Sequence, residues 1–378
     1  MAGIYIHIPF CKQKCYYCDF YTHQNLKYVD EYLQALANEV VLRKDFFKNT
    51  DNQINTIYFG GGTPSVLNSG QVRFLLDVIS DNFTIEKKTE ITFEANPDDL
   101  SAGYLKKLKA VGVNRLSIGI QSFNDSYLKL MNRRHNGAEA QDAVKQAQDA
   151  GFDNISTDLI YGLPDSNITT LESDLQKMAK LKIQHISAYH LTYEQKTVFG
   201  NYLKKGKLRE IPDEMSYKQY VYLCKFLSMH GFEHYEISNF ALNGKQSVHN
   251  SNYWRNIPYL GLGVASHSFD KENRSWNPSN LKTYISALQN NKLVYETENL
   301  SVTDKYNDYL LTGIRTNWGI SEEYILKEFG KDLHKHFSDN INSFLNAGFF
   351  DIKEKSLILK ENKWFQADNI VSKLMYIE

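Results

Sequence analysis

This 378-residue chain has few cysteines and no long apolar run, and no export signal is expected. None of its apolar runs approaches the ~18 residues that a membrane-spanning helix requires. Residues 1–10 lack the basic and apolar pattern of a signal peptide. Of the 4 cysteines, Cys224 stands alone in an apolar helical stretch, so a disulfide framework is not expected. Cys224 is predicted to be a small buried apolar side chain.

The charge of the chain is nearly balanced. Its 43 lysines and arginines against 44 aspartates and glutamates give a net charge of −1, which argues against bulk attraction to nucleic acid or to an anionic membrane. The length allows about two to three domains with a sizeable core. Composition therefore indicates a globular protein for which no nucleic-acid partner is expected.

The other three cysteines stand within eight residues, at Cys11, Cys15 and Cys18, in the frame Cys-x3-Cys-x2-Cys. This spacing suits three thiolates that bind one iron–sulfur cluster, and three ligands on a four-iron cluster leave one iron open to a small molecule. The alternatives are a structural zinc ion completed by His7 or His23, and thiols without any ligand. Motifs further along the chain favour the cluster.

Short apolar runs alternate with helical patterns through the first half of the chain. This order predicts an α/β fold with a parallel sheet and right-handed crossovers. Six such units can form a partial barrel, whereas a complete barrel needs eight. The predicted strands are residues 3–8, 54–59, 90–94, 115–119, 155–159 and 185–191. The predicted helices between and after them include residues 27–47, 101–111 with Ser101 as N-cap, 138–150 and 213–230.

After about residue 235 the alternation stops, and residues 234–269 are predicted to be irregular. Near the end of the chain, helices followed by a short hairpin resemble a winged-helix module. Its mixed charge favours packing against the barrel or a protein over DNA binding. We therefore expect a core at 1–235, a connecting region at 236–300 and a mostly helical C-terminal domain at 301–378. The predicted C-terminal elements are helices 304–316, 321–329 and 333–346, strands 350–352 and 357–359, and a last helix.

A glycine-rich segment, Gly60-Gly61-Gly62-Thr63-Pro64, directly follows the second predicted strand. Glycines let a backbone come close to a ligand, and proline fixes the turn. The alternative is an ordinary tight turn. Polar residues also follow later strands, and barrel active sites are built from such strand ends. A capping or solvent-facing role is the alternative for each of them. They are Glu94, Gln121, Arg133 and Asp158.

The cysteine frame and the residues before it, Tyr5-Ile6-His7-Ile8-Pro9-Phe10, resemble the radical S-adenosylmethionine superfamily. The resemblance implies an open six-stranded barrel and a 4Fe–4S cluster held by the three cysteines, whose open iron chelates S-adenosylmethionine. A cluster of this kind needs a reducing compartment, so a cytoplasmic location is expected. The positions that match cofactor contacts in the coproporphyrinogen III dehydrogenase-like subfamily are Tyr5, Tyr17, Gly61, Gly62, Thr63, Glu94, Gln121, Arg133 and Asp158.

Two branches of that subfamily must be separated. The HemN branch oxidatively decarboxylates coproporphyrinogen III in haem synthesis, and the HemW branch consists of haem chaperones without that activity. The chain starts ten residues before Cys11, whereas the dehydrogenases have a long N-terminal extension. Phe20 stands where their motif has a further cysteine. Both features favour the chaperone branch.

A third feature is the segment His249-Asn250-Ser251-Asn252-Tyr253-Trp254, which matches the His-Asn-x-x-Tyr-Trp signature of the haem chaperones. The resemblance implies that His249 binds haem. Neutral imidazole is a good axial ligand, and aromatic neighbours suit a flat macrocycle. The alternative is a hydrogen-bonded loop histidine. A nearby glycine-rich segment that ends at His267 also resembles the subfamily, and a ligand role for His267 stays open.

The sequence thus predicts a haem chaperone that binds a 4Fe–4S cluster, S-adenosylmethionine and haem. Haem is its expected cargo and a haem-acceptor protein its expected partner. Contact with a membrane protein and a homodimer are left open. The rival functions are coproporphyrinogen III dehydrogenase, which is not expected, and a nucleic-acid-modifying radical enzyme that uses the C-terminal module. Whether the chain is an enzyme stays open.

Overall fold

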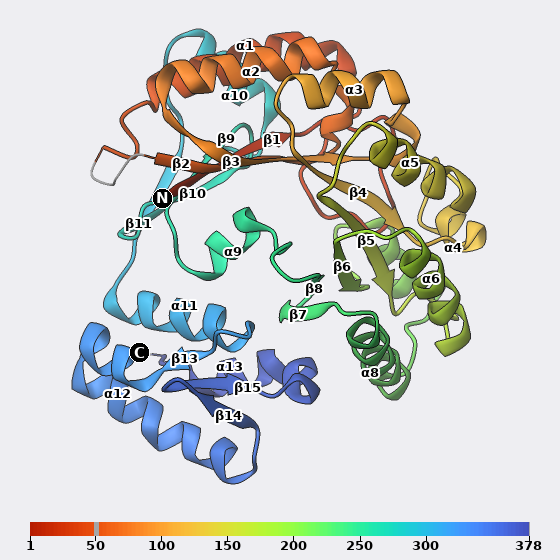
Figure 1. Ribbon diagram of the computed structural model, residues 1–378. Coiled ribbons are helices and arrows are strands. Elements are labelled where there is room, and N and C mark those ends of the chain that lie inside the picture. Colours follow the sequence, from red (N-terminus) through yellow and green to blue (C-terminus); the bar gives the residue numbers. More distant parts are fainter. Residues whose placement is uncertain (49–52, 378) are drawn as a thin grey trace.

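A computed structural model describes residues 1–48 and 53–377 of the chain (Figure 1). Six parallel strands, in chain order, form the centre of its large sheet. The register of β1 on β2 runs from Ala2 opposite Ile54 to Ile8 opposite Gly61, so these two strands end together. The six strands are β1 (Ala2–Ile8), β2 (Gln53–Gly61), β3 (Thr84–Ala95), β4 (Arg115–Gln121), β5 (Ile155–Tyr161) and β6 (His185–His190).

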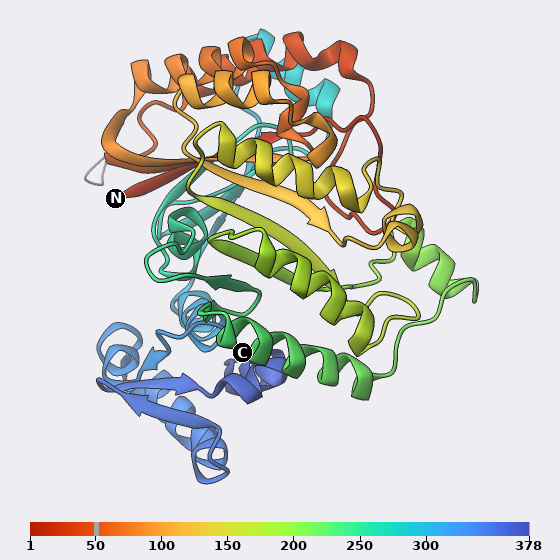
Figure 2. The ribbon, with the colours of Figure 1, turned by 45° about the vertical axis from the view of Figure 1, so that its right-hand side comes forward.

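The central strands are buried on both faces, as parallel strands in α/β proteins usually are. Every residue of β4 is buried, for example. Helices cover the outer face of the sheet (Figures 1 and 2). Ser101 caps α3 by accepting a hydrogen bond from the Tyr104 amide, which confirms the predicted N-cap. The covering helices are α1 (Val29–Leu42), α2 (Ser69–Asn82), α3 (Ala102–Ala110), α4 (Asp125–Leu130), α5 (Gly137–Asp149) and α6 (Ile168–Lys180).

Short strands extend the sheet at both edges. Beyond β6 lie the antiparallel strands β8 (Asn239–Ala241) and β7 (Glu233–Glu236). On the other side β9 (Tyr259–Leu262) pairs with β1 in parallel, and the antiparallel strands that follow are β10 (His267–Phe269), β11 (Asn273–Trp276) and β12 (Glu296–Asn299).

The prediction that residues 234–269 are irregular is therefore wrong. These strands are only three or four residues long, too short to show an alternating pattern, and pairing with distant strands specifies them. The helix α9 (Val248–Trp254) of the same segment lies on the concave side of the curved sheet (Figure 1). Two further helices follow β6 in the chain, α7 (Val198–Lys204) and α8 (Asp213–Met229). The helix α10 (Leu281–Gln289) packs on α1.

The C-terminal part lies on the side of the molecule opposite α1 and α2 (Figure 1). Gly330, with φ of 87°, breaks α12 at the point where the sequence predicts two separate helices. A small sheet in the order β13-β15-β14 completes this part. Its elements are α11 (Val302–Ile314), β13 (Ile320–Ser321), α12 (Glu322–Asn346), β14 (Phe350–Lys353), β15 (Ser356–Leu359), η4 (Glu361–Gln366) and α13 (Ala367–Leu374).

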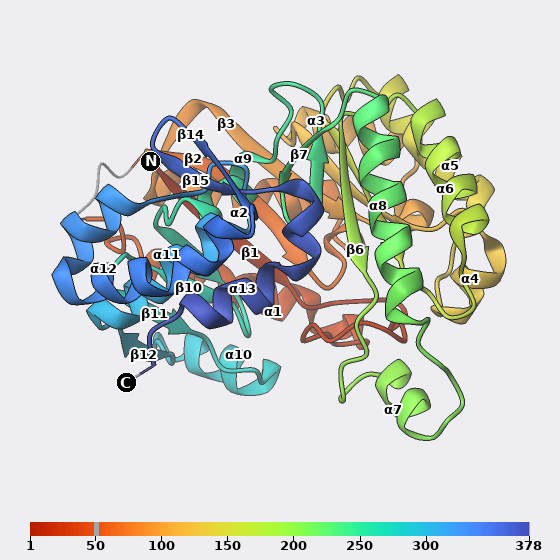
Figure 3. The ribbon, with the colours of Figure 1, turned by 90° about the horizontal axis from the view of Figure 1, so that it is seen from below.

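Seen from below, the C-terminal part lies in front of the central strands (Figure 3), and its η4 segment contacts α8. The Tyr220 hydroxyl of α8 donates a 3.0 Å hydrogen bond to the backbone carbonyl of Glu361, so η4 is fastened to the core. Among the described residues, no helix is long and apolar enough to cross a membrane.

Candidate functional site at the mouth of the barrel

The three cysteines lie on the loop that leaves the end of β1. The Cys11 amide donates to the His23 carbonyl at 3.1 Å and the Cys18 amide to the Cys15 carbonyl at 3.3 Å, which closes the loop on itself. Across the described residues, the three sulfur atoms are not all within 4.8 Å of one another. A single zinc ion bound by all three would require such closeness, because Zn–S bonds are about 2.3 Å long. In this arrangement the three sulfur atoms are therefore not placed to bind one zinc ion together.

His7, one of the two candidate fourth ligands for zinc, is engaged elsewhere. Its Nδ1 lies 3.2 Å from the Tyr5 hydroxyl and its Nε2 lies 3.1 Å from the Tyr21 carbonyl. Burial lowers the pKa of His7 to about 4, so the ring is neutral at pH 7. The surroundings of His7 thus fix its ring in place and leave neither nitrogen free.

Two polar side chains contact the sulfur atoms. The Thr63 hydroxyl donates to Cys11 Sγ at 3.3 Å, and Arg133 Nη1 donates to Cys15 Sγ at 3.4 Å. Burial raises the pKa of Cys11 to about 11, and it also raises the pKa of Cys18. Thiols in such surroundings stay protonated unless a cation offsets the thiolate charge. The Arg133 guanidinium and a bound metal group would both supply that offset.

Arg133 joins three segments at this end of the barrel. Its Nη2 donates to Asn96 Oδ1 at 2.7 Å, beyond β3, and to the Gly119 carbonyl of β4 at 2.5 Å. Asn132, in the left-handed conformation with φ of 60°, turns the chain so that this is possible. The desolvation of Tyr17 raises the pKa of its hydroxyl, and the positive charge of Arg133 opposes part of this increase.

The glycine turn is in contact with the cysteine loop. The Gly62 amide donates to the Ile8 carbonyl and the Thr63 amide donates to the Phe10 carbonyl, both at 2.9 Å. A Cβ at Gly61, where φ is 102°, would lie 2.4 Å from the His7 ring. A Cβ at Gly62 would lie 2.7 Å from the Ile8 carbonyl oxygen. These glycines are therefore required by the approach of the two loops, a reason that the sequence did not reveal.

Below the mouth, carboxylic acids line the barrel. Glu94 accepts hydrogen bonds from the Tyr58 hydroxyl at 2.7 Å and the Gly61 amide at 3.2 Å. Burial raises the pKa of Glu94 to about 7, and the negative charge of Asp158 adds to the shift. Burial likewise raises the pKa of Asp158 to about 6. Burial, followed by the charge of Glu94, raises the pKa of Tyr5. A positively charged ligand would hold both carboxyls ionised.

Gln121 stands at the end of β4 in a strained conformation. Its φ is 69°, uncommon for a residue other than glycine, and the register with β5 shifts between Ile118 and Gln121. The side chain is buried and lies within reach of Gly119 at the same end of the strand. Strained backbone of this kind is concentrated at functional sites.

His249 lies at the other end of the barrel, away from the cysteines. It is 1% exposed, its Nδ1 lies 2.8 Å from the Thr56 hydroxyl and its Nε2 lies 2.8 Å from the Tyr253 hydroxyl. The ring stacks on the Tyr58 ring with their centroids 5.0 Å apart, and the His249 backbone amide donates a 3.0 Å hydrogen bond to the Glu90 carboxylate. Haem ligation by His249 stays a prediction, and it would require one of these two ring hydrogen bonds to open.

Arg115 is a residue of the barrel that the sequence analysis missed. It is 1% exposed at the start of β4, and its Nε has no hydrogen-bond partner among the described residues. Its charge acts on Glu94, Asp158 and His249. A single arginine at the start of a strand without any other charged residue was the signal that could have revealed it.

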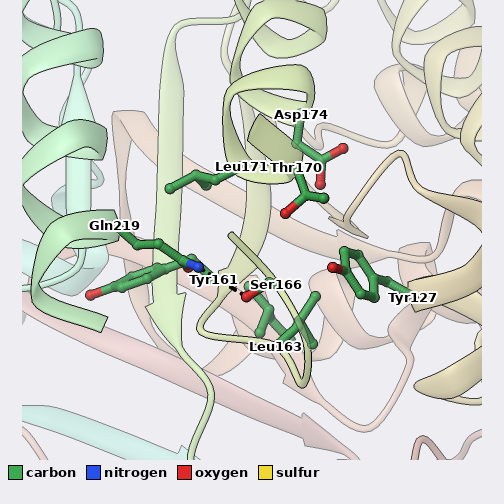
Figure 4. A pocket seen from close by; sticks show the side chains of 9 residues that line it. Tyr127, Tyr161, Leu163, Ser166, Thr170, Leu171, Asp174 and Gln219 are labelled. Atoms are coloured by element: carbon green, nitrogen blue, oxygen red, sulfur yellow. Dashed lines mark hydrogen bonds between the residues drawn. The ribbon is translucent and has the colours of Figure 1, made fainter. Parts of the chain in front are cut away.

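A small cavity outside the barrel has no part in this arrangement. Between α6 and α8 it has room for about one water molecule (Figure 4). Asp174 at its wall accepts hydrogen bonds from the Ser122 hydroxyl at 2.5 Å and the Phe123 amide at 3.0 Å. Asp174 therefore holds the β4–α4 turn in place.

Comparison with known proteins agrees with this geometry. Residues 5–178 match the Radical SAM superfamily. The chain is 36% identical to the heme chaperone HemW of Bacillus subtilis over 95% of both chains. It is 38% identical to the heme chaperone HemW of Escherichia coli over 70% of this chain and 69% of that one.

The chain belongs to the HemW family. Its fold also resembles the structure of coproporphyrinogen III oxidase (HemN) from Escherichia coli, described as a radical SAM enzyme. The TM-score is 0.85 at 22% identity, and the match covers 99% of this chain and 90% of that one. At this identity the likeness shows the shared fold, including the C-terminal part. HemW family membership and the radical SAM fold confirm the resemblance that the cysteine and His-Asn-x-x-Tyr-Trp motifs indicated.

Proposed function

We propose that the chain is a haem chaperone that holds a 4Fe–4S cluster and S-adenosylmethionine at the mouth of the barrel and delivers haem to an acceptor protein. The observation that carries the cofactor part is the set of contacts around the thiols. Three cysteines lie on one loop, Arg133 donates to one sulfur and Thr63 to another. The heme chaperone names of the relatives support the haem part.

Each group at the mouth has a distinct part in holding these cofactors. Cys11, Cys15 and Cys18 would ligate three irons, and Arg133 would offset the charge of the thiolates. Glu94 and Asp158, with raised pKa values, would favour a cationic ligand such as S-adenosylmethionine. The remaining predicted contacts are Tyr5, Tyr17, Gly61, Gly62, Thr63 and Gln121. When bound, a reduced cluster supplies one electron with which the sulfonium of S-adenosylmethionine can be cleaved.

His249 is the proposed haem ligand, on the basis of the family signature. Burial lowers its pKa to about 3, so the imidazole is neutral, the form that ligates iron. Its Nε2 faces the Tyr253 hydroxyl of the same helix, and a turn of that tyrosine would free the nitrogen. Haem binding at His249 is thus coupled to a rearrangement of α9.

The test is a haem titration of anaerobically reconstituted protein, followed by absorbance, in wild type and H249A. We expect saturable binding in the wild type, with weakened binding and altered haem bands in the variant. The exposed His230 provides the control, since H230A should leave both unchanged. Unchanged affinity and spectrum in H249A would remove the ligand assignment.

The second candidate function is coproporphyrinogen III dehydrogenation, which the fold shared with HemN favours. Reconstituted protein is incubated with coproporphyrinogen III, S-adenosylmethionine and a reductant, and tetrapyrrole product and 5′-deoxyadenosine are measured together. We expect intact substrate. Decarboxylated product would identify an enzyme and overturn the chaperone proposal.

A further inference from the structure

A second group of metal-ligating side chains lies far from the cysteine loop in sequence, where the core meets the C-terminal part. Cys224 of α8, His234 of β7 and Glu361 at the start of η4 each point one ligand atom toward the others, and these atoms all lie within 4.8 Å. Cys224 Sγ is 3.9 Å from His234 Nδ1, and that nitrogen is 3.3 Å from Glu361 Oε1.

The separations are close to those around a tetrahedral zinc ion. With Zn–S of about 2.3 Å and Zn–N or Zn–O of about 2.0 Å, two ligand atoms of one tetrahedral site lie about 3.3–3.6 Å apart. The sulfur–nitrogen and nitrogen–oxygen pairs therefore need shifts of only a few tenths of an ångström. The Glu361 side chain is 52% exposed, so it has the freedom to approach the sulfur and leaves one face open to a water ligand.

The His234 ring is held in the orientation that ligation requires. Phe240 stacks on it at 4.0 Å, and Trp364 packs on it at 4.3 Å. Its Nε2 lies 3.4 Å from the Ile237 carbonyl, an acceptor. Metal-ligating histidines typically donate their second N–H to such a carbonyl, which leaves the other nitrogen free for the metal.

The oxygen acceptors around His234 also favour a cation at this position. Both ring nitrogens face oxygen acceptors, the Ile237 carbonyl and the Glu361 carboxylate. A neutral ring can donate to one of them only, and the other nitrogen then faces an acceptor lone pair. A metal ion on Nδ1 satisfies both acceptors without protonating the ring.

We propose that Cys224, His234 and Glu361 form a second metal site, separate from the cysteine loop, that takes a borderline-soft divalent cation of the Zn²⁺ class. Thiolate, imidazole and carboxylate are the donors that zinc accepts together, whereas magnesium and calcium select oxygen. Binding releases the thiol proton of Cys224 to solvent as the Zn–S bond forms. No electron transfer is involved.

The site would fasten the C-terminal part to the core. Cys224 and His234 belong to elements of the core, and Glu361 begins the C-terminal segment η4. Trp364 of the same segment is only 3% exposed and packs on His234. A bound ion adds a coordinate link at the place where the Tyr220 hydroxyl already holds the Glu361 carbonyl. The metal would therefore stabilise this junction.

The experiment is a Co²⁺ titration of the full chain in which Cys11, Cys15 and Cys18 are replaced by alanine, so that the loop cannot compete. We expect one Co²⁺ per chain, a sulfur-to-cobalt charge-transfer band, visible bands of a four-coordinate ion, and displacement by Zn²⁺. Adding C224S should abolish the charge-transfer band. Adding E361Q, at a half-exposed position that does not endanger folding, should weaken binding at least tenfold.

The matched control is H230A, which removes an exposed histidine at the end of the same helix α8 and should change nothing. Circular dichroism checks that each variant folds. Absence of saturable binding, or a charge-transfer band that persists in C224S, would overturn the proposal. Because the cluster ligands are absent from every sample, failure here would leave the proposed haem chaperone function untouched.

Discussion

The two ends of the barrel are built from the same strands and differ in how their polar groups are satisfied. At the mouth, buried thiols and carboxyls have raised pKa values, and Arg133 has an Nε without a hydrogen-bond partner among the described residues. At the base, both ring nitrogens of His249 are hydrogen bonded. A buried polar group without a partner is costly, and a bound ligand can remove that cost. A buried polar group that is fully hydrogen bonded instead contributes to the stability of the fold. A ligand at the mouth would therefore meet groups that still lack partners, whereas haem ligation by His249 at the base would first have to break a hydrogen bond of the imidazole ring.

The largest expected effect is at the mouth, in the cysteine loop. In C15A, iron per chain after anaerobic reconstitution should fall from about four to near background, because three thiolates are the only protein ligands proposed for the cluster. Iron analysis and the iron-linked absorbance measure this. C224A is the control and should retain its iron. Full iron in C15A would contradict the assignment.

At the base, T56V should lower the free energy of unfolding by about 1–3 kcal/mol, because the near-isosteric valine leaves His249 Nδ1 buried without a partner. Urea unfolding measures it, and T297V on the exposed β12 is the control. The cluster absorbance should be unchanged. A stable T56V protein that has lost its cluster would break the distinction between the two ends.

The Glu94 carboxyl at the mouth should make the stability of the protein depend on pH. Because burial raises its pKa from 4.5 to about 7, the folded cofactor-free protein keeps a proton that the unfolded chain releases between these values. Its contribution to stability therefore falls as pH rises through this window. E94Q should stabilise the cofactor-free protein by about 3 kcal/mol above pH 7 and not below pH 4.5.

Thermal unfolding at several pH values measures the effect of E94Q, and E296Q on the exposed β12 provides the control. The same variant should bind S-adenosylmethionine more weakly, because it cannot become negatively charged. Equal stability of wild type and E94Q at pH 8 would show that the carboxyl is not destabilised by burial.

The smallest expected effect concerns Tyr253. Y253F removes the hydroxyl that occupies His249 Nε2, and it should raise haem affinity about fivefold, the equivalent of about 1 kcal/mol. A haem titration measures it beside H249A. Weaker haem binding in Y253F would instead show that the hydroxyl itself takes part in binding.

Much of the fold and of the mouth could be predicted from the sequence, because the signals are local. The six central strands follow from apolar runs, and the three cysteines and the Ser101 cap follow from spacing and residue type. The short strands after residue 233 could not be predicted, since three or four residues carry no pattern and distant partners specify them. The site positions matched by resemblance still await measurement.

Contacts between distant segments account for the rest. Thr56 lies 193 positions from His249, so the hydrogen bond that occupies Nδ1 leaves no trace in the sequence around either residue. Cys224 is buried as predicted, yet its neighbour Glu361 comes from the far end of the chain. Arg115 did leave a local signal, because it is the one charged residue of a buried strand.

The central claim is that the mouth holds a cluster with one iron open to S-adenosylmethionine. The most direct test is the electron paramagnetic resonance spectrum of the reduced, reconstituted protein with and without S-adenosylmethionine. The account predicts a 4Fe–4S signal whose shape changes when S-adenosylmethionine is added. A signal that S-adenosylmethionine leaves unchanged, or the absence of an iron–sulfur signal, would contradict it.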